Sequence, residues 1–278
     1  MSKQPARERL DKLLVQRGLA KSREQAQALI MAGAVYVDDQ RVDKPGKRVP
    51  VEARITVKAR MPYVSRGGYK LAAMLDHLQL SVKGWTCVDV GASTGGFTDV
   101  LLQRGARRVY AIDVGYGQLA WKLRQDPRVV VMERTNIRHV TTLPEPMDLA
   151  TVDVSFIGLH LVLPNVVRLV RQGGWVIALI KPQFEAGPHQ VGKGGIVRDS
   201  NVHREVLQRV LRLAEELALG LHALIPSPIR GAEGNVEFMA AWRKDQPSTL
   251  DTVKAVEEVV EQARTLPERR LLLPDEKG

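Results

Sequence analysis

The stretch from Val88 to Asp99, which reads VDVGASTGGFTD, constrains the fold of this chain more than any other. The apolar run from Cys87 to Val90 predicts a short buried strand, and a tight glycine-rich turn follows over Gly91 to Gly96. Phe97 to Gln103 then has the apolar spacing of a helix. A strand, a glycine turn and a helix in this order are typical of a ligand site at the carboxyl end of a parallel sheet. The alternative is an ordinary strand-to-helix turn.

The next predicted strand favours the ligand site, because it ends on an acid. This strand runs from Arg107 to Asp113, and Asp113 lies 22 positions after Gly91. An acidic residue about 20 residues beyond the glycine turn is placed to bind the ribose hydroxyls of a nucleoside cofactor. The middle glycine of the dinucleotide fingerprint, which lets the backbone approach a pyrophosphate, is Ser93 here. A cofactor with a ribose and no phosphate therefore fits better, and S-adenosylmethionine (SAM) is such a cofactor.

Strands alternate with helices over most of the chain, which is typical of a parallel α/β sheet. The expected strands are 87–90, 107–113, 128–132, 147–153, 174–181, 222–225 and 236–242. The expected helices are 71–78, 97–103, 119–124, 159–170, 202–217 and 250–263, and residues 182–197 are expected to form an irregular loop. The last two strands could form a β-hairpin that gives the sheet an antiparallel edge. The fold class is thus α/β, with a Rossmann-like sheet of the SAM-dependent methyltransferase type.

The net charge of +10 is distributed unevenly along the 278 residues. Residues 1–60 hold 14 Lys and Arg against 7 Asp and Glu, a net of +7, so the other 218 residues carry only +3. A basic N-terminal part on a nearly neutral body favours a polyanionic partner, most simply a nucleic acid. The alternative is an ordinary solvated surface.

The N-terminal part also has its own element pattern, which predicts a small α+β domain. Helices are expected over 7–18 and from the capping residue Ser22 to Gly33, followed by strands at 35–37 and 54–57. The runs RLDKLL, Gly18, Ser22-Arg23 and GAVYV resemble the alpha-L RNA-binding module of the S-four type. The expected domains are residues 1–60, a linker at 61–65, a catalytic domain at 66–266 and a loose tail at 267–278. The candidate RNA-binding residues are Arg9, Lys12, Arg17, Lys21, Ser22, Arg23, Arg41 and Arg66.

Several classes of protein are disfavoured by what the sequence lacks. It has no run of 18 apolar residues and no visible signal peptide, and its single cysteine, Cys87, lies in a core strand, so we expect a cytoplasmic protein without membrane association. The six histidines show no metal-ligand spacing, so we expect no metal. Gly187 and Gly192-Lys193 imitate a phosphate-binding loop, but Gly194 stands where a Ser or Thr must bind magnesium.

The ends of the predicted strands carry the chemistry, because ligands bind at the carboxyl ends of parallel strands. Asp113, Asp153 and Lys181 stand at those ends. Burial and a nearby cation lower the pKa of a lysine, and a neutral lysine can accept a proton. Two other kinds of SAM-dependent methyl transfer are disfavoured. Methylation at C5 of a base needs a nucleophilic cysteine, and the single Cys87 lies in the predicted core. Enzymes that methylate an exocyclic amine commonly carry Asn or Asp, then Pro-Pro and Tyr or Phe, after the fourth strand, where Asp153 to Phe156 reads DVSF. A hydroxyl acceptor activated by lysine remains.

Five stretches of the chain resemble the TlyA family of rRNA methyltransferases, whose catalytic domain is similar to the FtsJ-type ribose 2′-O-methyltransferases. They are SRGGYKL at 65–71, DVGASTGGFTD at 89–99, DVSFI at 153–157, KPQFE at 181–185 and GNVEF at 234–238. The resemblance implies a catalytic tetrad, which carries over onto Lys70, Asp153, Lys181 and Glu237. It implies that Lys181 is the general base or steers the hydroxyl, that Asp153 and Lys70 set its protonation and geometry, and that Glu237 orients the second lysine or the ribose.

The expected reaction is the transfer of a methyl group from SAM to a ribose 2′-hydroxyl of ribosomal RNA. The family's acceptors are cytidines of small-subunit and, in many members, large-subunit rRNA. The expected cofactor-binding residues are Asp89, Gly91, Ala92, Ser93, Thr94, Gly95, Gly96, Phe97, Asp113, Asn136 and Asp153. The rival hypotheses are a non-catalytic RNA-binding factor of ribosome assembly and a membrane-lytic protein, since family members are often called hemolysins.

Overall fold

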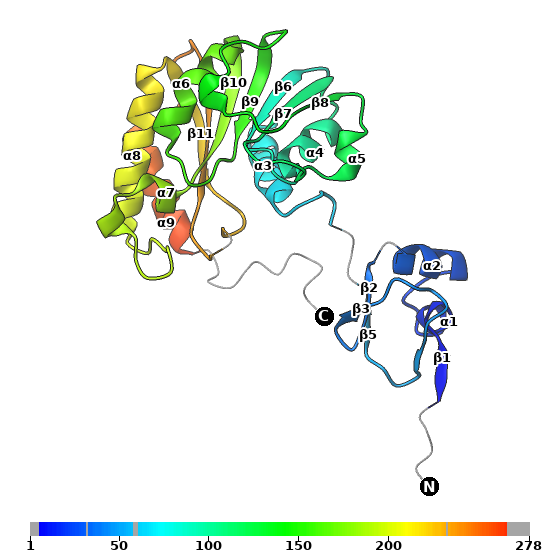
Figure 1. Cartoon of the computed structure of the whole chain (residues 1–278). Helices are drawn as coiled ribbons and strands as arrows, with labels where there is room; N and C mark the ends of the chain where they lie inside the picture. The colour runs from blue at the N-terminus through cyan, green and yellow to red at the C-terminus, as the bar shows by residue number, and fades with distance from the viewer. Residues whose placement is uncertain (1–5, 32, 58–60, 232, 266–278) are drawn as a thin grey trace. The chain divides into compact units, whose positions relative to one another are not determined.

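The computed structural model describes residues 6–31, 33–57, 61–231 and 233–265. The described residues fall into two compact units, which divide between Pro62 and Tyr63 (Figure 1). Each unit has its own hydrophobic core. The predicted tail at 267–278 and residues 58–60, at the end of the predicted N-terminal domain, lie outside the described residues.

The N-terminal unit packs two helices against short antiparallel strands. Its elements are β1 (Arg7–Arg9), α1 (Leu10–Gln16), α2 (Arg23–Met31), β2 (Val35–Val37), β3 (Gln40–Arg41), β4 (Arg48–Pro50) and β5 (Ile55–Val57). The strands form a three-stranded sheet of order β3-β2-β5 and a separate β1-β4 pair. Leu10, Leu14 and Ile30 from the helices are fully buried with Val35 of β2, so the apolar faces of α1 and α2 form this core.

The start of the predicted first helix is wrong. Residues 7–9 form β1, which pairs antiparallel with β4, and the helix begins only at Leu10. Pairing with a strand about 40 residues away decides the conformation of these residues, and no local pattern announces it. The predicted cap of the second helix is confirmed, since the Ser22 hydroxyl accepts a hydrogen bond from the Gln25 backbone N–H at 3.2 Å.

The larger unit is built on a seven-stranded sheet of order β11-β12-β10-β9-β6-β7-β8. The strands are β6 (Thr86–Val90), β7 (Arg108–Ile112), β8 (Val129–Met132), β9 (Met147–Val152), β10 (Val170–Ile180), β11 (Leu219–Pro226) and β12 (Phe238–Lys244). The neighbouring strands β10, β9, β6, β7 and β8 are mutually parallel, whereas β12 is antiparallel to both of its neighbours, β10 and β11. The predicted α/β class and the antiparallel hairpin are confirmed, although β12 lies inside the sheet and β11 forms the edge.

Helices cover both faces of this sheet (Figure 1). They are α3 (Gly67–His77), α4 (Gly96–Gln103), α5 (Trp121–Arg124), α6 (Leu159–Leu169), α7 (Pro182–Glu185), α8 (Ser200–Glu216) and α9 (Thr252–Arg264), with 3₁₀ turns η1 (Ile137–His139) and η2 (Pro188–Gln190). The predicted loop at 182–197 therefore contains two short helical turns. It joins β10 to α8 at the carboxyl end of the sheet.

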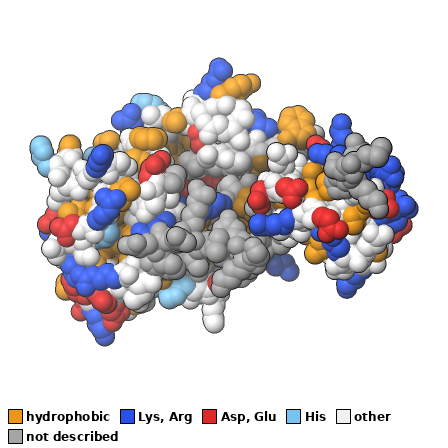
Figure 2. Space-filling model, turned by 90° about the horizontal axis from the view of Figure 1, so that it is seen from below, with side chains coloured by type: hydrophobic (Ala, Val, Ile, Leu, Met, Phe, Trp, Pro, Cys, Tyr) orange, Lys and Arg blue, Asp and Glu red, His pale blue; other side chains and the backbone are white. Residues whose placement is uncertain are grey.

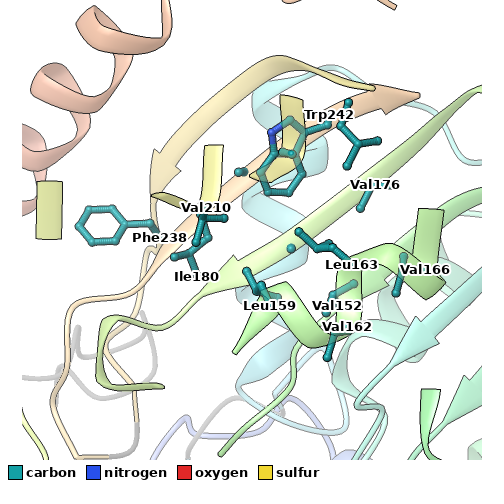
Figure 3. Packing of buried hydrophobic residues seen from close by; sticks show 14 of the residues in the cluster. Val152, Leu159, Val162, Leu163, Val166, Val176, Ile180, Val210, Phe238 and Trp242 are labelled. Carbon is teal, nitrogen blue, oxygen red and sulfur yellow. The ribbon is translucent and has the colours of Figure 1, made fainter. Parts of the chain in front are cut away.

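Two apolar layers sandwich the sheet, because successive strand residues point to opposite faces. One layer joins the sheet to α6, α8 and α9, and Figure 3 shows part of it, with Val152 and Val176 facing Leu159, Leu163 and Val166 of α6. The other layer joins the sheet to α3, α4 and α5. This rigid platform fixes where each strand ends, and the side chains that follow the strands are placed accordingly.

Candidate active site

The glycine turn after β6 is held in a conformation that only glycine adopts readily. Gly91 has φ +83°, and a Cβ there would lie 2.4 Å from the backbone oxygen of Asp153. A Cβ on Gly96 would lie 2.3 Å from the Ser65 hydroxyl and 2.9 Å from the backbone nitrogen of Gly68. The two glycines therefore let the turn close against the end of β9 and against the start of α3.

Asp89 anchors this turn from beneath. The carboxyl group is completely buried, and its Oδ2 accepts hydrogen bonds from the backbone N–H and hydroxyl of Thr98 at 2.9 and 2.7 Å. Its Oδ1 accepts from the Thr151 hydroxyl at 3.1 Å. Burial raises the pKa of Asp89 from 3.8 to about 6, and the hydrogen bonds from Thr98 and Thr151 offset part of that rise. Asp89 thus positions the turn.

We expect the Asp89→Asn variant to gain stability relative to the wild type as the pH rises. Because the pKa of Asp89 is raised in the folded state, the folded protein binds more protons than the unfolded one, and this contribution is lost as the pH rises through about 6. An asparagine has no such loss. Between about pH 5 and pH 7.5 the difference in unfolding free energy should shift by about 1.4 kcal/mol in favour of the variant.

Urea denaturation at a series of pH values measures this difference. Asp126→Asn is the matched control, because the hydrogen bond and charge of Arg128 hold the pKa of Asp126 below its ordinary value, outside this pH window. A stability difference for Asp89→Asn that stays constant with pH would show that Asp89 does not titrate there.

A cavity of about 430 Å³ opens beside the turn, at the carboxyl ends of β6, β7 and β9. Its lining includes five of the expected cofactor-binding residues: Gly91, Ser93, Asp113, Asn136 and Asp153. Ala92, Thr94, Gly95, Gly96 and Phe97 form the rest of the turn and the start of α4, and neither they nor Asp89 belong to the described lining. The cavity lies within the size range of small-molecule and cofactor sites.

Two lining residues are fixed by backbone hydrogen bonds. The carboxylate of Asp113 follows β7 directly and accepts from the N–H groups of Ser93 and Gly115, both at 2.7 Å. These bonds hold it across the mouth of the turn and leave lone pairs for a ligand. The side chain of Asn136 accepts from the backbone N–H of Arg138 at 3.0 Å and so caps η1.

Two ion pairs lie at this end of the sheet, and Asp153, a member of one of them, lines the cavity. The ammonium of Lys181 lies 2.6 Å from Oδ1 of Asp153 and donates a 2.9 Å hydrogen bond to the Ser155 hydroxyl. The ammonium of Lys70 lies 2.6 Å from Oε2 of Glu237. Both lysines and Glu237 are buried, so each charge depends on its partner. Removing one member of a buried pair leaves an uncompensated charge, which destabilises proteins by about 3–5 kcal/mol.

The sheet topology explains why Asp153, Lys181 and Glu237 come to the same end, where Lys70 of α3 meets Glu237. Asp153 and Lys181 follow the parallel strands β9 and β10, and Glu237 precedes β12, whose antiparallel direction brings its start to the same edge. The ion pairs are also linked through neighbours. Gln183 donates to Oε1 of Glu237 at 3.3 Å, and a Cβ on Gly67, one turn before Lys70, would lie 4.0 Å from Oδ2 of Asp153.

Comparison with known proteins gives the family. Residues 63–244 match the FtsJ-like methyltransferase family, and residues 8–55 match the S4 domain. The chain is 45% identical to the TlyA protein of Mycobacterium tuberculosis, named a 16S/23S rRNA (cytidine-2′-O)-methyltransferase, over 92% of this chain and 97% of that protein. The chain belongs to the TlyA family. It is also 48% identical to YqxC of Bacillus subtilis, named as a candidate rRNA methyltransferase, over 97% of this chain and 99% of that protein.

A solved structure with a hemolysin name is similar as well. It comes from Streptococcus thermophilus and matches with a TM-score of 0.72 and 45% identity, covering 93% of this chain and 96% of that one. The resemblance to the TlyA family, the S4-type N-terminal module and the FtsJ-type domain expected from the sequence are confirmed. In the part of this TlyA-family chain that the structure describes, no helix is long and apolar enough to cross a bilayer.

Three polar residues of the site received no role from the sequence. Ser155 and Gln183 contact Lys181 and Glu237 as described above. The third is Glu185, whose Oε1 accepts the backbone N–H of Leu159 at 2.7 Å and whose pKa is raised by burial. This bond ties the segment after β10 to the start of α6. All three lie within family stretches, but none directly follows a strand, which is the signal that marks Asp113, Asp153 and Lys181.

Several candidate RNA-binding residues are engaged within the N-terminal unit. Arg9 and Arg23 both contact Oδ2 of the buried Asp11, at 2.9 and 3.1 Å. Hydrogen bonds from Arg9, Gln27 and Arg23 hold the pKa of Asp11 well below its usual range, against the effect of burial. Arg17 donates to the backbone oxygens of Ala53 and Val51. Each guanidinium keeps unused N–H donors, so these contacts orient arginines at the surface without preventing phosphate contacts.

The other candidates are placed differently. Lys12, Lys21 and Arg41 are exposed, and the Arg41 guanidinium lies over Gly33, within 2.2 Å of where a Cβ would be. Ser22 caps α2, and the half-buried Arg66 directly precedes α3 in the larger unit. On the face of the N-terminal unit that Figure 2 shows, Lys and Arg side chains are interspersed with Asp and Glu.

Proposed function

We propose that this chain is a SAM-dependent methyltransferase that modifies a ribose 2′-hydroxyl of ribosomal RNA. The observation that carries the proposal is the position of Asp153. It lines the cavity beside the glycine turn and is paired with the buried Lys181, so a cofactor cavity and a candidate proton acceptor share one residue. The membership in the TlyA family supports the same reaction.

SAM fits the cavity by the chemistry of its lining. Asp113 would accept hydrogen bonds from the ribose hydroxyls, and the backbone of Gly91 and Ser93 would approach the ligand closely. The apolar Ile112, Val114 and Ile157 offer surface to an adenine ring. When bound, the cofactor supplies an electrophilic methyl group on a sulfonium. Asp153 would place that group beside the ion pairs.

The chain's own residues would handle the proton of the acceptor. A ribose hydroxyl is a very weak acid, and its attack on a methyl carbon is favoured when a neighbouring group removes or orients its proton. Lys181 would serve as that group, held in place by Asp153 and Ser155. The Lys70–Glu237 pair would orient the ribose and add a second cation near Lys181. The reaction forms a C–O bond, breaks the C–S bond and releases the hydroxyl proton.

The RNA substrate is inferred from the N-terminal unit and from the relatives. We infer that residues 1–60 form the RNA-binding domain, that 61–65 link it to a catalytic domain at 66–266, and that the protein works in the cytoplasm, where ribosomes are assembled. The M. tuberculosis relative is named for cytidines of 16S and 23S rRNA, and a Campylobacter jejuni relative, 34% identical over 66% of this chain, for 23S rRNA alone. We therefore propose a cytidine in one or both rRNAs, presented as deproteinised RNA or within subunits.

Mapping 2′-O-methyl groups in rRNA tests the proposal. Ribosomal subunits from cells that lack this protein would be incubated with labelled SAM and the purified chain, and the modified positions would be mapped. We expect a label at cytidine ribose with the wild type and none with Lys181→Ala. Tight RNA binding with no methyl transfer would instead favour the assembly-factor hypothesis. Dye release from liposomes would favour the membrane-lytic one.

A further inference from the structure

A second cavity, of about 450 Å³, opens on the face of the sheet covered by α8 and α9. Three arginines from separate segments line it: Arg198 precedes α8, Arg230 lies in the loop between β11 and β12, and Arg264 ends α9. We call this cavity the arginine pocket. Glu233 is the one acidic residue among its described lining. In Figure 1 the loop after β11 and the start of α8 lie at the same lower edge of the sheet as α7, which follows the catalytic strand β10.

Arg198 and Arg264 keep hydrogen-bond donors for a ligand. Within the described residues, the exposed guanidinium of Arg198 has no hydrogen-bond or ion-pair partner. Arg264 donates to the Ser200 hydroxyl at 3.3 Å and pairs with Glu261 at 2.7 Å, which uses only part of its five donors. Three guanidinium groups and the single carboxylate of Glu233 give the described lining an excess of positive charge, which suits an anion with several acceptor oxygens.

The walls of the arginine pocket are rigid. Asn235 is buried; its Oδ1 accepts from the Val197 N–H and its Nδ2 donates to the Gly195 oxygen, both at 2.9 Å. This clamp joins the segment before Arg198 to the loop that carries Arg230. The buried ring of His203 packs edge-on against the ring of Phe238, with 5.5 Å between the ring centroids. A preformed pocket binds with a smaller loss of conformational entropy than a mobile surface does.

The arginine pocket and the ion pair of Glu237 lie on opposite sides of one short segment of the chain. Val236 lines the arginine pocket, and the next residue, Glu237, pairs with Lys70 on the other side of the sheet. The backbone oxygen of Glu237 also accepts the Ser227 N–H at 2.8 Å, which fixes the segment. For both sites to hold one RNA strand, the strand would run round this edge of the sheet, from Lys181 to the arginine pocket.

We propose that the arginine pocket binds a backbone phosphate of the RNA strand next to the target nucleotide. Phosphodiester oxygens match guanidinium N–H groups in charge and geometry. The proposal rests on the proposed function, because it assumes an RNA substrate at the ion pairs. A free phosphate ion has the same chemistry and is the other possible occupant.

The test compares two double variants. Arg198→Ala/Arg264→Ala removes two arginines of the pocket, and Arg230 is kept because it donates to the Gly234 oxygen at 3.1 Å in the segment before Glu237. Arg168→Ala/Arg171→Ala is the control. It changes the net charge by the same amount. Like the pocket variant, it removes one exposed arginine without a described partner, Arg168, and one ion-paired arginine, Arg171. Arg171 stands at the amino end of β10 and lies 2.7 Å from Asp148.

Binding to deproteinised rRNA without SAM is measured as a function of salt. The pocket variant should bind roughly tenfold more weakly near physiological salt, and the slope of log K against log salt should fall by about 0.7, because one phosphate contact to a single strand is lost. The control should keep the wild-type slope. Equal slopes for all three proteins, or equal losses in both variants, would overturn the proposal.

Two further measurements distinguish an RNA phosphate from a free phosphate ion and from a loss of folding. Calorimetry with inorganic phosphate would overturn the RNA assignment if phosphate alone bound tightly to the wild type and not to the pocket variant. Thermal unfolding of the pocket variant should match the control, since both alter exposed side chains. If the wild type transferred no methyl group to rRNA but the slope still fell in the pocket variant, the proposed reaction would fail while the phosphate site would stand.

Discussion

Replacing Lys181 by arginine is expected to slow methyl transfer by about 10²-fold or more, as much as replacing it by alanine. Arginine keeps the positive charge and the capacity to donate to Asp153 and Ser155, but it stays protonated at any working pH. A general base must accept the hydroxyl proton, and arginine cannot. The pair of variants therefore distinguishes a base from an electrostatic clamp.

Single-turnover rates at saturating SAM and RNA are the decisive measurement, because they report the chemical step alone. Near-normal turnover by Lys181→Arg would exclude the base role and leave Lys181 as a group that orients the hydroxyl. A loss in Lys181→Ala that is largely restored in Lys181→Arg points to the same conclusion. SAM affinity should change little in either variant.

A second lysine provides the control. Lys122 also pairs with an aspartate, Asp99, at 3.0 Å in the same domain, but it lies outside the ion pairs at the ends of β9 and β10. Lys122→Ala and Lys122→Arg should keep the wild-type rate. Thermal unfolding checks that Lys181→Ala still folds, since Asp153 then loses its cation but remains partly open to solvent.

Two members of the proposed tetrad, Asp153 and Lys181, are predicted by physical reasoning, and the other two only by resemblance. Asp113, Asp153 and Lys181 could be found because apolar runs mark strands, and each of the three directly follows the end of a strand. Lys70 and Glu237 are separated by 167 positions, and their pairing arises from tertiary structure. On α3, Lys70 reads as an ordinary polar residue of an amphipathic helix, and no local pattern shows that it is buried.

The order of the strands in the sheet could not be predicted from the sequence either, because it also depends on contacts between distant residues. The antiparallel direction of the last two strands fits the 11 residues, 227–237, that join them, because a parallel crossover needs a dozen or more. The insertion of β12 between β10 and β11 is decided by non-local pairing. In the N-terminal unit, strands of three residues such as β1 and β4 are too short to show a period of two. For this reason the prediction of a helix over 7–18 is wrong at residues 7–9, which form β1.

Replacing Asp113 by alanine is expected to weaken SAM binding by roughly 10- to 150-fold for each hydrogen bond to the ribose that is lost, since a bond to a charged group contributes about 1.5–3 kcal/mol. Asp113 lines the cavity directly after β7, and its position is set by the backbone of Ser93 and Gly115. Calorimetric titration of SAM measures the loss. The same affinity in wild type and variant would remove Asp113 from the site.

The two backbone hydrogen bonds give this variant a second effect. Alanine also removes the acceptor for the N–H groups of Ser93 and Gly115, so the turn itself can loosen. Asp113→Asn retains one side-chain oxygen and loses the charge, and it should weaken binding less than alanine does. Asp126→Ala is the matched control, because Asp126 likewise accepts a backbone N–H, from Arg128 at 2.9 Å, but lies outside the described lining of the cavity.

An altered ligand separates ribose recognition from loosening of the turn. The demethylated product S-adenosylhomocysteine and its analogue without ribose hydroxyls would be titrated into wild type and Asp113→Ala. If Asp113 binds the ribose, the wild type should prefer the natural ligand strongly, whereas the variant should bind the two about equally, which is the coupling that a double-mutant cycle measures. A variant that still discriminates as well as the wild type would show that other groups bind the ribose and that Asp113 only supports the turn.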